Sequence, residues 1–245
     1  MADLSAETIS SLLSENKFPS RIIVKTTTGS TSDDVRGLVD LEDWTVVLAK
    51  EQTAGRGRHG KNFYSPKNTG IYLSMIVPIS SENISRATPA SAVAVCRTIE
   101  QIAPKTNPKI KWVNDILING KKVAGILCET IPRTERIIVG VGINLTTEEF
   151  PKDIENTAGS VFPDSKDNNT IASVLIRELK TALTNFNFLE EYRRKSAVIG
   201  KPIKYLENNQ WYDADCIGIA ENGGIIIRQK KEIKTLTSGE ISIRI

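Results

Sequence analysis

The chain of 245 residues has little of the chemistry that metal sites and nucleophilic hydrolases use. It contains one histidine, His59, and three cysteines, Cys96, Cys128 and Cys216. The cysteines lie far apart and form no C-x-x-C pair, so with a single histidine they make no zinc site. A Ser-His-Asp triad would need His59 itself, and the chain has no G-x-S-x-G segment. Cysteines that are few and scattered are expected to be buried as small apolar residues. They also predict that the protein works in a reducing, cytoplasmic compartment.

Long apolar runs and a strong net charge are also missing. No run approaches the roughly 20 residues that cross a bilayer, and the N-terminus lacks the basic region and apolar core of a signal peptide. We therefore expect no membrane partner. The net charge of +3 is too small to indicate a nucleic-acid-binding protein. With 40% hydrophobic and 25% charged residues, the composition is that of a globular protein with one large domain or a large and a small one.

Hydrophobic periodicity predicts an α+β fold in which a mixed sheet has flanking helices. The first part of the chain has strands predicted over 21–25, 45–51, 70–78, 110–118, 122–129 and 136–145, and helices over 5–16, 87–103, 168–188 and 188–196. Asn119-Gly120 is typical of a hairpin turn. After Gly200 five short strands, over 202–206, 211–219, 224–229, 232–236 and 241–245, predict a small barrel. We therefore expect a domain of residues 1–198 and a smaller one of 199–245.

A glycine-rich loop, Gly55-Arg56-Gly57-Arg58-His59-Gly60, has the strongest functional signal. Its glycines let the backbone wrap closely around a ligand, and Arg56 and Arg58 are suited to phosphate or carboxylate. The loop fits G-x-G-x-x-G, but residues 61–70 carry turn formers and a proline where a dinucleotide site needs a helix. No H-R-D or D-F-G segment follows, so a kinase is excluded too. By itself the loop is more typical of an ordinary basic surface loop.

Four further segments combine polar groups with small or apolar neighbours. They are Gly29-Ser30-Thr31-Ser32-Asp33, Lys111-Trp112-Val113-Asn114-Asp115, Lys122-Val123-Ala124-Gly125-Ile126-Leu127 and Gly140-Val141-Gly142-Ile143-Asn144. Thr31 or Ser32 is a candidate helix N-cap. The second segment belongs to the predicted strand 110–118. Lys122, taken alone, is more typical of a solvated strand end. The two glycines of the last segment weaken a strand unless another group approaches closely.

Together, in this order and spacing, the segments resemble the biotin–protein ligases. The match is to the family's G-R-G-R-x-G, K-W-P-N-D, K-[LV]-A-G-I-L and G-x-G-I-N motifs, and Gly239-Glu240-Ile241-Ser242 is similar to the G-E-[IV]-S of its C-terminal barrel. The resemblance runs from about residue 20 to the C-terminus. It implies a class II synthetase-like catalytic domain followed by an SH3-like barrel. Ser32, Val113 and His59 depart from the family's usual asparagine, proline and arginine.

The resemblance implies that biotin and MgATP form biotinyl-5′-AMP, and that biotin then passes to a lysine of a biotin carboxyl carrier domain. Fixed cations would let two mutually repelling anions react, and closure of residues 55–66 would keep water from the anhydride. The implied catalytic residues are Lys122, Arg56 and Arg58. The implied biotin-binding residues are Ser30, Thr31, Gln52, Gly55, Arg56 and Lys122. The implied nucleotide-binding residues are Arg58, Phe63, Lys111, Asn114, Asp115 and Asn144. We assign no metal ligand, and Mg²⁺ is expected to arrive with ATP.

Two alternatives stay open at this point. One is a lipoate–protein ligase, which has related chemistry. The other is a nucleic-acid-binding module in which Trp112, Phe63 and Tyr64 stack on bases. The segment before residue 20 is too short for a helix-turn-helix domain, so we expect no sequence-specific DNA binding. A homodimer and a monomer are both compatible with the sequence.

Overall fold

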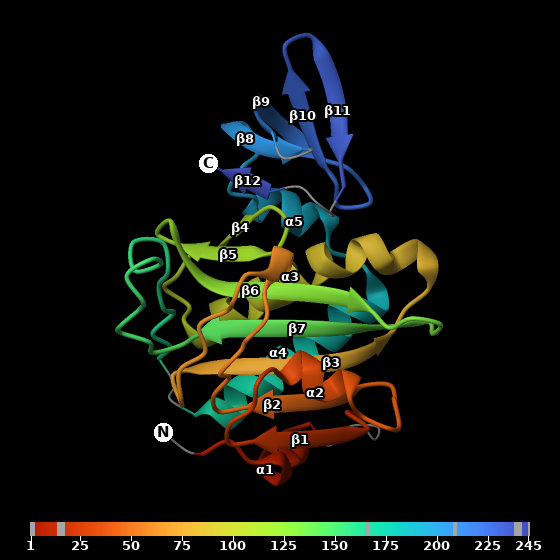
Figure 1. Ribbon diagram of the computed structural model, residues 1–245, viewed down its shortest axis with the longest axis vertical. Coiled ribbons are helices and arrows are strands. Elements are labelled where there is room, and N and C mark those ends of the chain that lie inside the picture. The colour runs from red at the N-terminus through yellow and green to blue at the C-terminus, as the bar shows by residue number, and fades with distance from the viewer. Residues whose placement is uncertain (1–2, 14–17, 165–166, 208–209, 238–241, 245) are drawn as a thin grey trace.

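Two β-sheets build the molecule (Figure 1). The computed structural model describes residues 3–13, 18–164, 167–207, 210–237 and 242–244. The larger sheet has seven strands in the order β1-β2-β3-β7-β6-β5-β4. Its strands are β1 (Arg21–Lys25), β2 (Thr45–Ala49), β3 (Gly70–Pro78), β4 (Lys109–Lys111), β5 (Asp115–Ile118), β6 (Lys121–Thr130) and β7 (Arg136–Asn144). Only the β1–β2 pairing is parallel, so the sheet is mixed, as the sequence predicts.

Helices cover both faces of this sheet. They are α1 (Ala6–Leu12), α2 (Thr31–Arg36), α3 (Ile84–Ile102), α4 (Asn168–Asn185) and α5 (Leu189–Lys195), with short 3-10 helices η1 (Arg58–Gly60) and η2 (Ser81–Asn83). Helices α3 and α4 pack against each other behind the sheet, while α2 lies in front of it (Figure 1). Alternate strand residues therefore enter different cores. Val47 of β2 and Ile76 of β3 pack with Val35 of α2, whereas Val46 and Met75 belong to the main core.

Strand register brings three rows of residues together on the α2 face of β3, β7 and β6. The first row is Tyr72, Gly142 and Gly125, and Gly125 pairs in turn with Asp115 of β5. The second row is Ser74, Gly140 and Leu127, and the third is Ile76, Ile138 and Glu129. The functional site is built on these rows.

The smaller sheet is antiparallel and has the order β11-β10-β9-β8-β12. Its strands are β8 (Pro202–Glu207), β9 (Gln210–Ile219), β10 (Ile225–Gln229), β11 (Glu232–Leu236) and β12 (Ser242–Arg244). Residues 239–241 of the predicted G-E-I-S match lie outside the described residues. Trp112 Nε1 donates a hydrogen bond to Gly223 O at 2.9 Å, which ties the β9–β10 turn to the larger sheet. Closure of this sheet into a barrel and a boundary after residue 198 stay predictions.

The predicted single strand over 110–118 is wrong. The chain reverses at residues 112–114, so that β4 and β5 form an antiparallel pair with Lys111 opposite Asp115. A continuous strand would send Trp112 and Val113 to opposite faces, whereas the reversal buries both of them. The N-cap prediction is also wrong: Ser30 caps α2, and Thr31 and Ser32 lie inside the helix. Within the described ranges, no helix is both long and apolar enough to span a membrane.

Candidate active site

A cavity of about 300 Å³ lies on the α2 face, between α2, the glycine loop and the strands β3, β6 and β7. It gathers segments that are far apart in the sequence. Eleven of the twelve residues that the sequence analysis singles out line it: Ser30, Thr31, Gln52, Arg56, Arg58, Phe63, Lys111, Asn114, Asp115, Lys122 and Asn144. The exception is Gly55. A side chain there would come within 2.5 Å of Phe63 O and 2.9 Å of Gln52 Nε2, so its glycine serves the packing of the loop itself.

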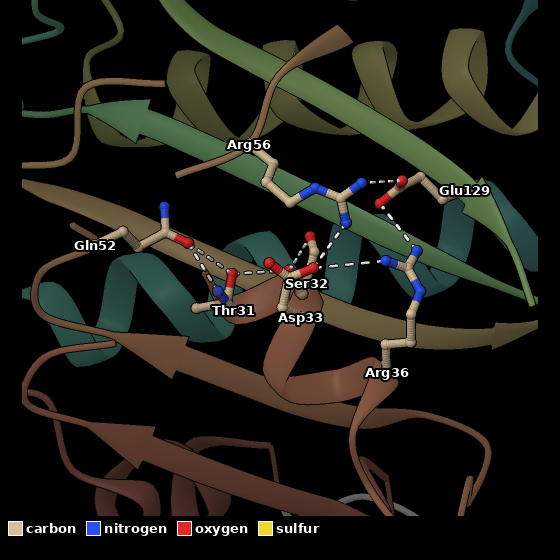
Figure 2. Close-up of polar contacts among 8 residues, drawn as sticks. Thr31, Ser32, Asp33, Arg36, Gln52, Arg56 and Glu129 are labelled. Carbon is tan, nitrogen blue, oxygen red and sulfur yellow. Dashed lines mark hydrogen bonds and ion pairs between the residues drawn. The ribbon is translucent and has the colours of Figure 1, made fainter. Parts of the chain in front are cut away.

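Hydroxyl and amide groups form one end of the cavity. Ser74 Oγ lies 2.8 Å from Thr31 Oγ1 and 2.9 Å from Ser32 Oγ (Figure 2 labels Thr31 and Ser32). Gln52 Oε1 accepts hydrogen bonds from the backbone N and the Oγ1 of Thr31, at 2.9 and 3.1 Å. Gln52 Nε2 donates to Ser65 Oγ at 2.9 Å, which fixes the orientation of the amide. This end can offer hydrogen bonds to an uncharged polar group.

Ser74 is a site residue that the sequence analysis missed. It is fully buried, and it is the one hydroxyl among the apolar residues Leu73, Met75, Ile76 and Val77 of β3. A lone serine in such a strand is a usable signal, because a buried hydroxyl needs a hydrogen-bonding partner.

Two glycines form the floor of the cavity, and the Phe63 ring lies on them. A side chain at Gly142 would stand 2.4 Å from Phe63 Cε1, and one at Gly125 would stand 3.2 Å from Phe63 Cε2. The sequence analysis predicts a close approach at Gly140 and Gly142. At Gly142 the approaching group is Phe63, and a side chain at Gly140 would stand 3.0 Å from Ser32 Oγ. Lys122 Nζ lies 5.9 Å from the centroid of the same ring, within cation–π range.

The opposite end of the cavity is cationic. Lys122 Nζ forms an ion pair of 2.6 Å with Asp115 Oδ1. Arg58 Nη1 donates to Asn114 Oδ1 at 3.3 Å, and Asn114 Nδ2 donates to Ile126 O at 3.0 Å. Burial lowers the pKa of the Arg58 guanidinium, and the Asp115 carboxylate opposes this shift. Lys111 also lines this end, so positive groups outnumber the one carboxylate.

Asn144 occupies the edge of this cationic end with one polar atom unused. Its Nδ2 donates to Gly159 O at 3.0 Å, while its buried Oδ1 has no hydrogen-bonding partner among the described residues. A buried acceptor without a partner is costly unless a ligand donates to it. Phe150 lines the cavity nearby and contacts the Tyr64 ring at 6.2 Å between centroids. The sequence analysis did not find Phe150, which lies outside every motif.

Arg56 lines the cavity, yet its guanidinium is occupied by protein carboxylates. Its Nη1 lies 2.8 Å from Asp33 Oδ1, and its Nη2 lies 2.8 Å from Glu129 Oε1 (Figure 2). Its expected role as a ligand of biotin's carboxylate and of phosphate stays a prediction. Among the described residues there is no cluster of histidine, cysteine, aspartate and glutamate that could hold a metal ion. The single carboxylate of Asp115 suits a Mg²⁺ ion that arrives on substrate phosphates.

Comparisons with known proteins agree with this geometry. Residues 20–144 match the model of the biotin/lipoate A/B protein ligase family. The biotin–[acetyl-CoA-carboxylase] ligase of Mycobacterium tuberculosis is 32% identical over 213 residues, which cover 80% of this chain and 77% of that protein. The bifunctional ligase/repressor BirA of Escherichia coli is 29% identical over 224 residues, which cover 84% of this chain and 68% of BirA.

A solved structure of biotin protein ligase from Aquifex aeolicus, in complex with biotin and ATP, has a TM-score of 0.81 and 25% identity. The alignment covers 91% of this chain and 98% of that one. The family match over residues 20–144 and the extended identity to the mycobacterial ligase lead to one conclusion: this chain belongs to the biotin/lipoate A/B protein ligase family.

Proposed function

We propose that this protein is a biotin–protein ligase, which activates biotin with MgATP and transfers it to a lysine of a biotin carboxyl carrier domain. The observation that carries the proposal is the two-ended cavity. Biotin has an uncharged ureido ring at one end and a carboxylate at the other, and the cavity has hydrogen-bonding groups at one end and cations at the other. The relatives named above, two of them ligases for biotin, support the same substrate.

The uncharged end suits the ureido ring. Ser30, Thr31 and Gln52 offer donors and acceptors there. Ser74 Oγ holds Thr31, and Ser65 Oγ holds Gln52. Lipoate has no ureido group, so it would gain none of the hydrogen bonds that biotin can form at this end, each worth roughly 0.5–1.5 kcal/mol. This is the physical reason to prefer biotin over lipoate.

The cationic end suits the first chemical step. A carboxylate oxygen of biotin attacks the α-phosphorus of ATP, a phosphorus–oxygen bond forms, and pyrophosphate leaves with the electrons of the broken bond. Lys122 and Arg58 lie where they can stabilise the negative charge that accumulates in this transition state. Asn144 Oδ1, which has no hydrogen-bonding partner among the described residues, could accept from an amino group of the nucleotide base. Asn114 and Asp115 line the same end and would hold the phosphates and their Mg²⁺.

The second step is acyl transfer. The amine of the acceptor lysine attacks the carbonyl carbon of the anhydride, an amide bond forms, and AMP leaves. Phe63 and the glycine loop line the cavity, and closure of residues 55–66 over it would keep water from the anhydride until the lysine arrives. We place the reaction in the cytoplasm, since Cys96, Cys128 and Cys216 are free thiols.

The nucleic-acid-binding alternative fits the structure poorly. Trp112 is only 4% exposed and its ring nitrogen is bonded to Gly223 O, so it cannot stack on a passing base. We propose no sequence-specific DNA binding.

Exchange of labelled pyrophosphate into ATP tests the proposal. The wild-type protein should catalyse it with biotin and not with lipoate, and it should biotinylate a purified carrier domain. Pyrophosphate exchange by Lys122→Ala should fall about ten- to a hundredfold, because the substitution removes a charge-assisted contact worth roughly 1.5–3 kcal/mol. Lys121→Ala is the matched control, since this neighbouring lysine is exposed and lies outside the cavity lining. Wild-type protein that shows neither activity would refute the proposal.

A further inference from the structure

A closed ring of four alternating charges lies beside the uncharged end of the cavity (Figure 2). Arg56 contacts Asp33 and Glu129 at 2.8 Å each. Arg36 completes the ring, with Nη1 at 3.5 Å from Asp33 Oδ1 and Nη2 at 3.3 Å from Glu129 Oε2. Both terminal nitrogens of Arg56 are therefore engaged, and the two arginines and two carboxylates sum to zero charge.

The ring joins three separate elements. Asp33 and Arg36 belong to α2, whose first turn carries Thr31 and Ser32 into the cavity. Glu129 belongs to β6 and to the third row of the sheet face. It follows by two residues Leu127, which lines the cavity. Arg56 is the second residue of the glycine loop. The loop's position relative to the uncharged end of the cavity thus depends on the ring.

Fixing Arg56 also fixes the rest of the loop, because the loop pairs with itself. Gly57 N donates to Lys61 O at 2.7 Å, and Phe63 N donates to Gly55 O at 2.8 Å. Arg56 and Asn62 face each other in this small antiparallel ladder. A displacement of Arg56 would therefore move the backbone that carries Phe63 over the glycine floor.

The two ends of the cavity differ in the charged side chains that line them. At the far end Lys122, Arg58 and Lys111 face one carboxylate, Asp115. At the ring, every arginine charge is matched by a carboxylate. An incoming anion would have to displace Asp33 or Glu129 from Arg56, whereas at the other end three cationic side chains and one carboxylate line the cavity.

We propose that Glu129 and Asp33 are positioning residues, which hold Arg56 as a strut that sets the glycine loop against the biotin ring, and that Arg56 is not itself the anion ligand. This inference rests on the proposed function and changes one assignment within it. Anion binding then belongs to Lys122 and Arg58. The strut needs a forked side chain, because one guanidinium must bond two carboxylates that approach from different elements.

The Glu129→Gln variant separates the two roles of Arg56 by the sign of its effect. If Arg56 is a strut, this change loosens the loop, and the dissociation constant of biotin should rise about two- to fivefold, the range expected for a partly exposed ion pair. If Arg56 binds anions directly, removing a competing carboxylate frees it, and biotin should bind as tightly as before or more tightly.

Biotin methyl ester provides a second readout that a general loss of stability would not reproduce. The strut acts on the ring end of the ligand, so Glu129→Gln should weaken the uncharged ester by the same factor as biotin. Direct anion binding predicts an effect on biotin and none on the ester. Titration calorimetry measures both ligands with the full chain.

Three further variants complete the experiment. Asp33→Asn should behave as Glu129→Gln does, and it replaces that variant if Glu129→Gln does not fold by circular dichroism. Arg56→Lys keeps the charge but loses the fork, so it should weaken biotin as much as Arg56→Gln. Glu178→Gln is the matched control: its side chain is 20% exposed, close to the 22% of Glu129, and it pairs with Arg97 between α3 and α4.

The possible failures are distinguishable. Wild-type protein without biotin-dependent pyrophosphate exchange would reject the proposed function. Active wild type, together with unchanged or tighter biotin binding in Glu129→Gln and Asp33→Asn, would reject the strut and restore Arg56 as an anion ligand. Full retention of biotin affinity in Arg56→Lys would also reject the strut.

Discussion

Gly142→Ala tests the close contact on which the floor of the cavity depends. An alanine Cβ at this position would stand 2.4 Å from Phe63 Cε1 and 2.8 Å from both Cδ1 and Cζ. These atoms belong to a rigid ring, so the overlap cannot be relieved by turning the end of a flexible chain. Either the Phe63 ring leaves the floor or strand β7 shifts.

The loss of stability can be estimated for each of these two responses. Overpacking of this kind costs about 1–3 kcal/mol, and exposing half of a phenylalanine side chain costs about 1 kcal/mol. We expect the free energy of unfolding to fall by about 1–2 kcal/mol, which lowers the melting temperature by about 2–8 °C for a domain of this size. Gly125→Ala should cost less, because its Cβ would meet the ring at 3.2 Å and the mobile end of Lys122 at 3.2–3.3 Å.

A double-mutant cycle with Phe63→Ala isolates the contact, measured by thermal unfolding. Without the ring, the three nearest atoms that an alanine Cβ at position 142 would meet are gone, and an alanine restricts the unfolded chain more than glycine does. The same substitution should then be neutral or stabilising by up to about 1 kcal/mol. The coupling between the two positions should be about 1–2 kcal/mol. Equal destabilisation by Gly142→Ala in both backgrounds would refute this explanation of the strand glycine.

Two other expectations follow from the same geometry. Ser74→Ala should weaken biotin binding about five- to tenfold and leave ATP binding unchanged, because the buried Ser74 hydroxyl supports Thr31 and Ser32 at the uncharged end. Calorimetry with each ligand tests this, and Ser91→Ala is the control because Ser91 is equally buried. Parallel losses of affinity for both ligands would contradict the expectation. Burial raises the pKa of the Cys96 thiol to about 12, whereas an unfolded thiol titrates near 8.5. Above about pH 8.5 the unfolded state loses a proton that the folded state keeps, so stability should fall by about 1.4 kcal/mol per pH unit for this thiol until about pH 12. Melting temperatures between pH 8 and 10.5 should decline more steeply for the wild type than for Cys96→Ala, and identical slopes would count against the shift.

The sequence locates the site well because its motifs are local. Each motif is a short continuous segment in a loop or a strand, and the sheet brings these segments to one face, so eleven residues chosen from the sequence line one cavity. Most strands were also predictable, since alternating or continuous apolar runs bounded by turn residues identify them. The helix α2 was not, because six residues are too few to show a helical period.

Features that depend on register could not be predicted in this way. Ser74 joins the site because it falls in the same row as Gly140, and Glu129 joins the charge ring because it falls in the row of Ile76 and Ile138. A shift of one residue in either pairing would turn these side chains to the other face. The break at 112–114 was missed for a related reason, since only the tertiary fold shows that Trp112 and Val113 must both be buried.

The glycine loop can serve both ends of the cavity because its backbone changes direction between its two arginines. In an extended segment, Arg56 and Arg58 would point to the same side. Instead the extended backbone ends at Gly57, which precedes the 3-10 turn η1 that begins with Arg58. Arg56 is thereby left on the side of Glu129, while Arg58 reaches Asn114. One arginine can then be neutralised to hold the loop while the other lies at the end of the cavity that we propose for the reacting anions.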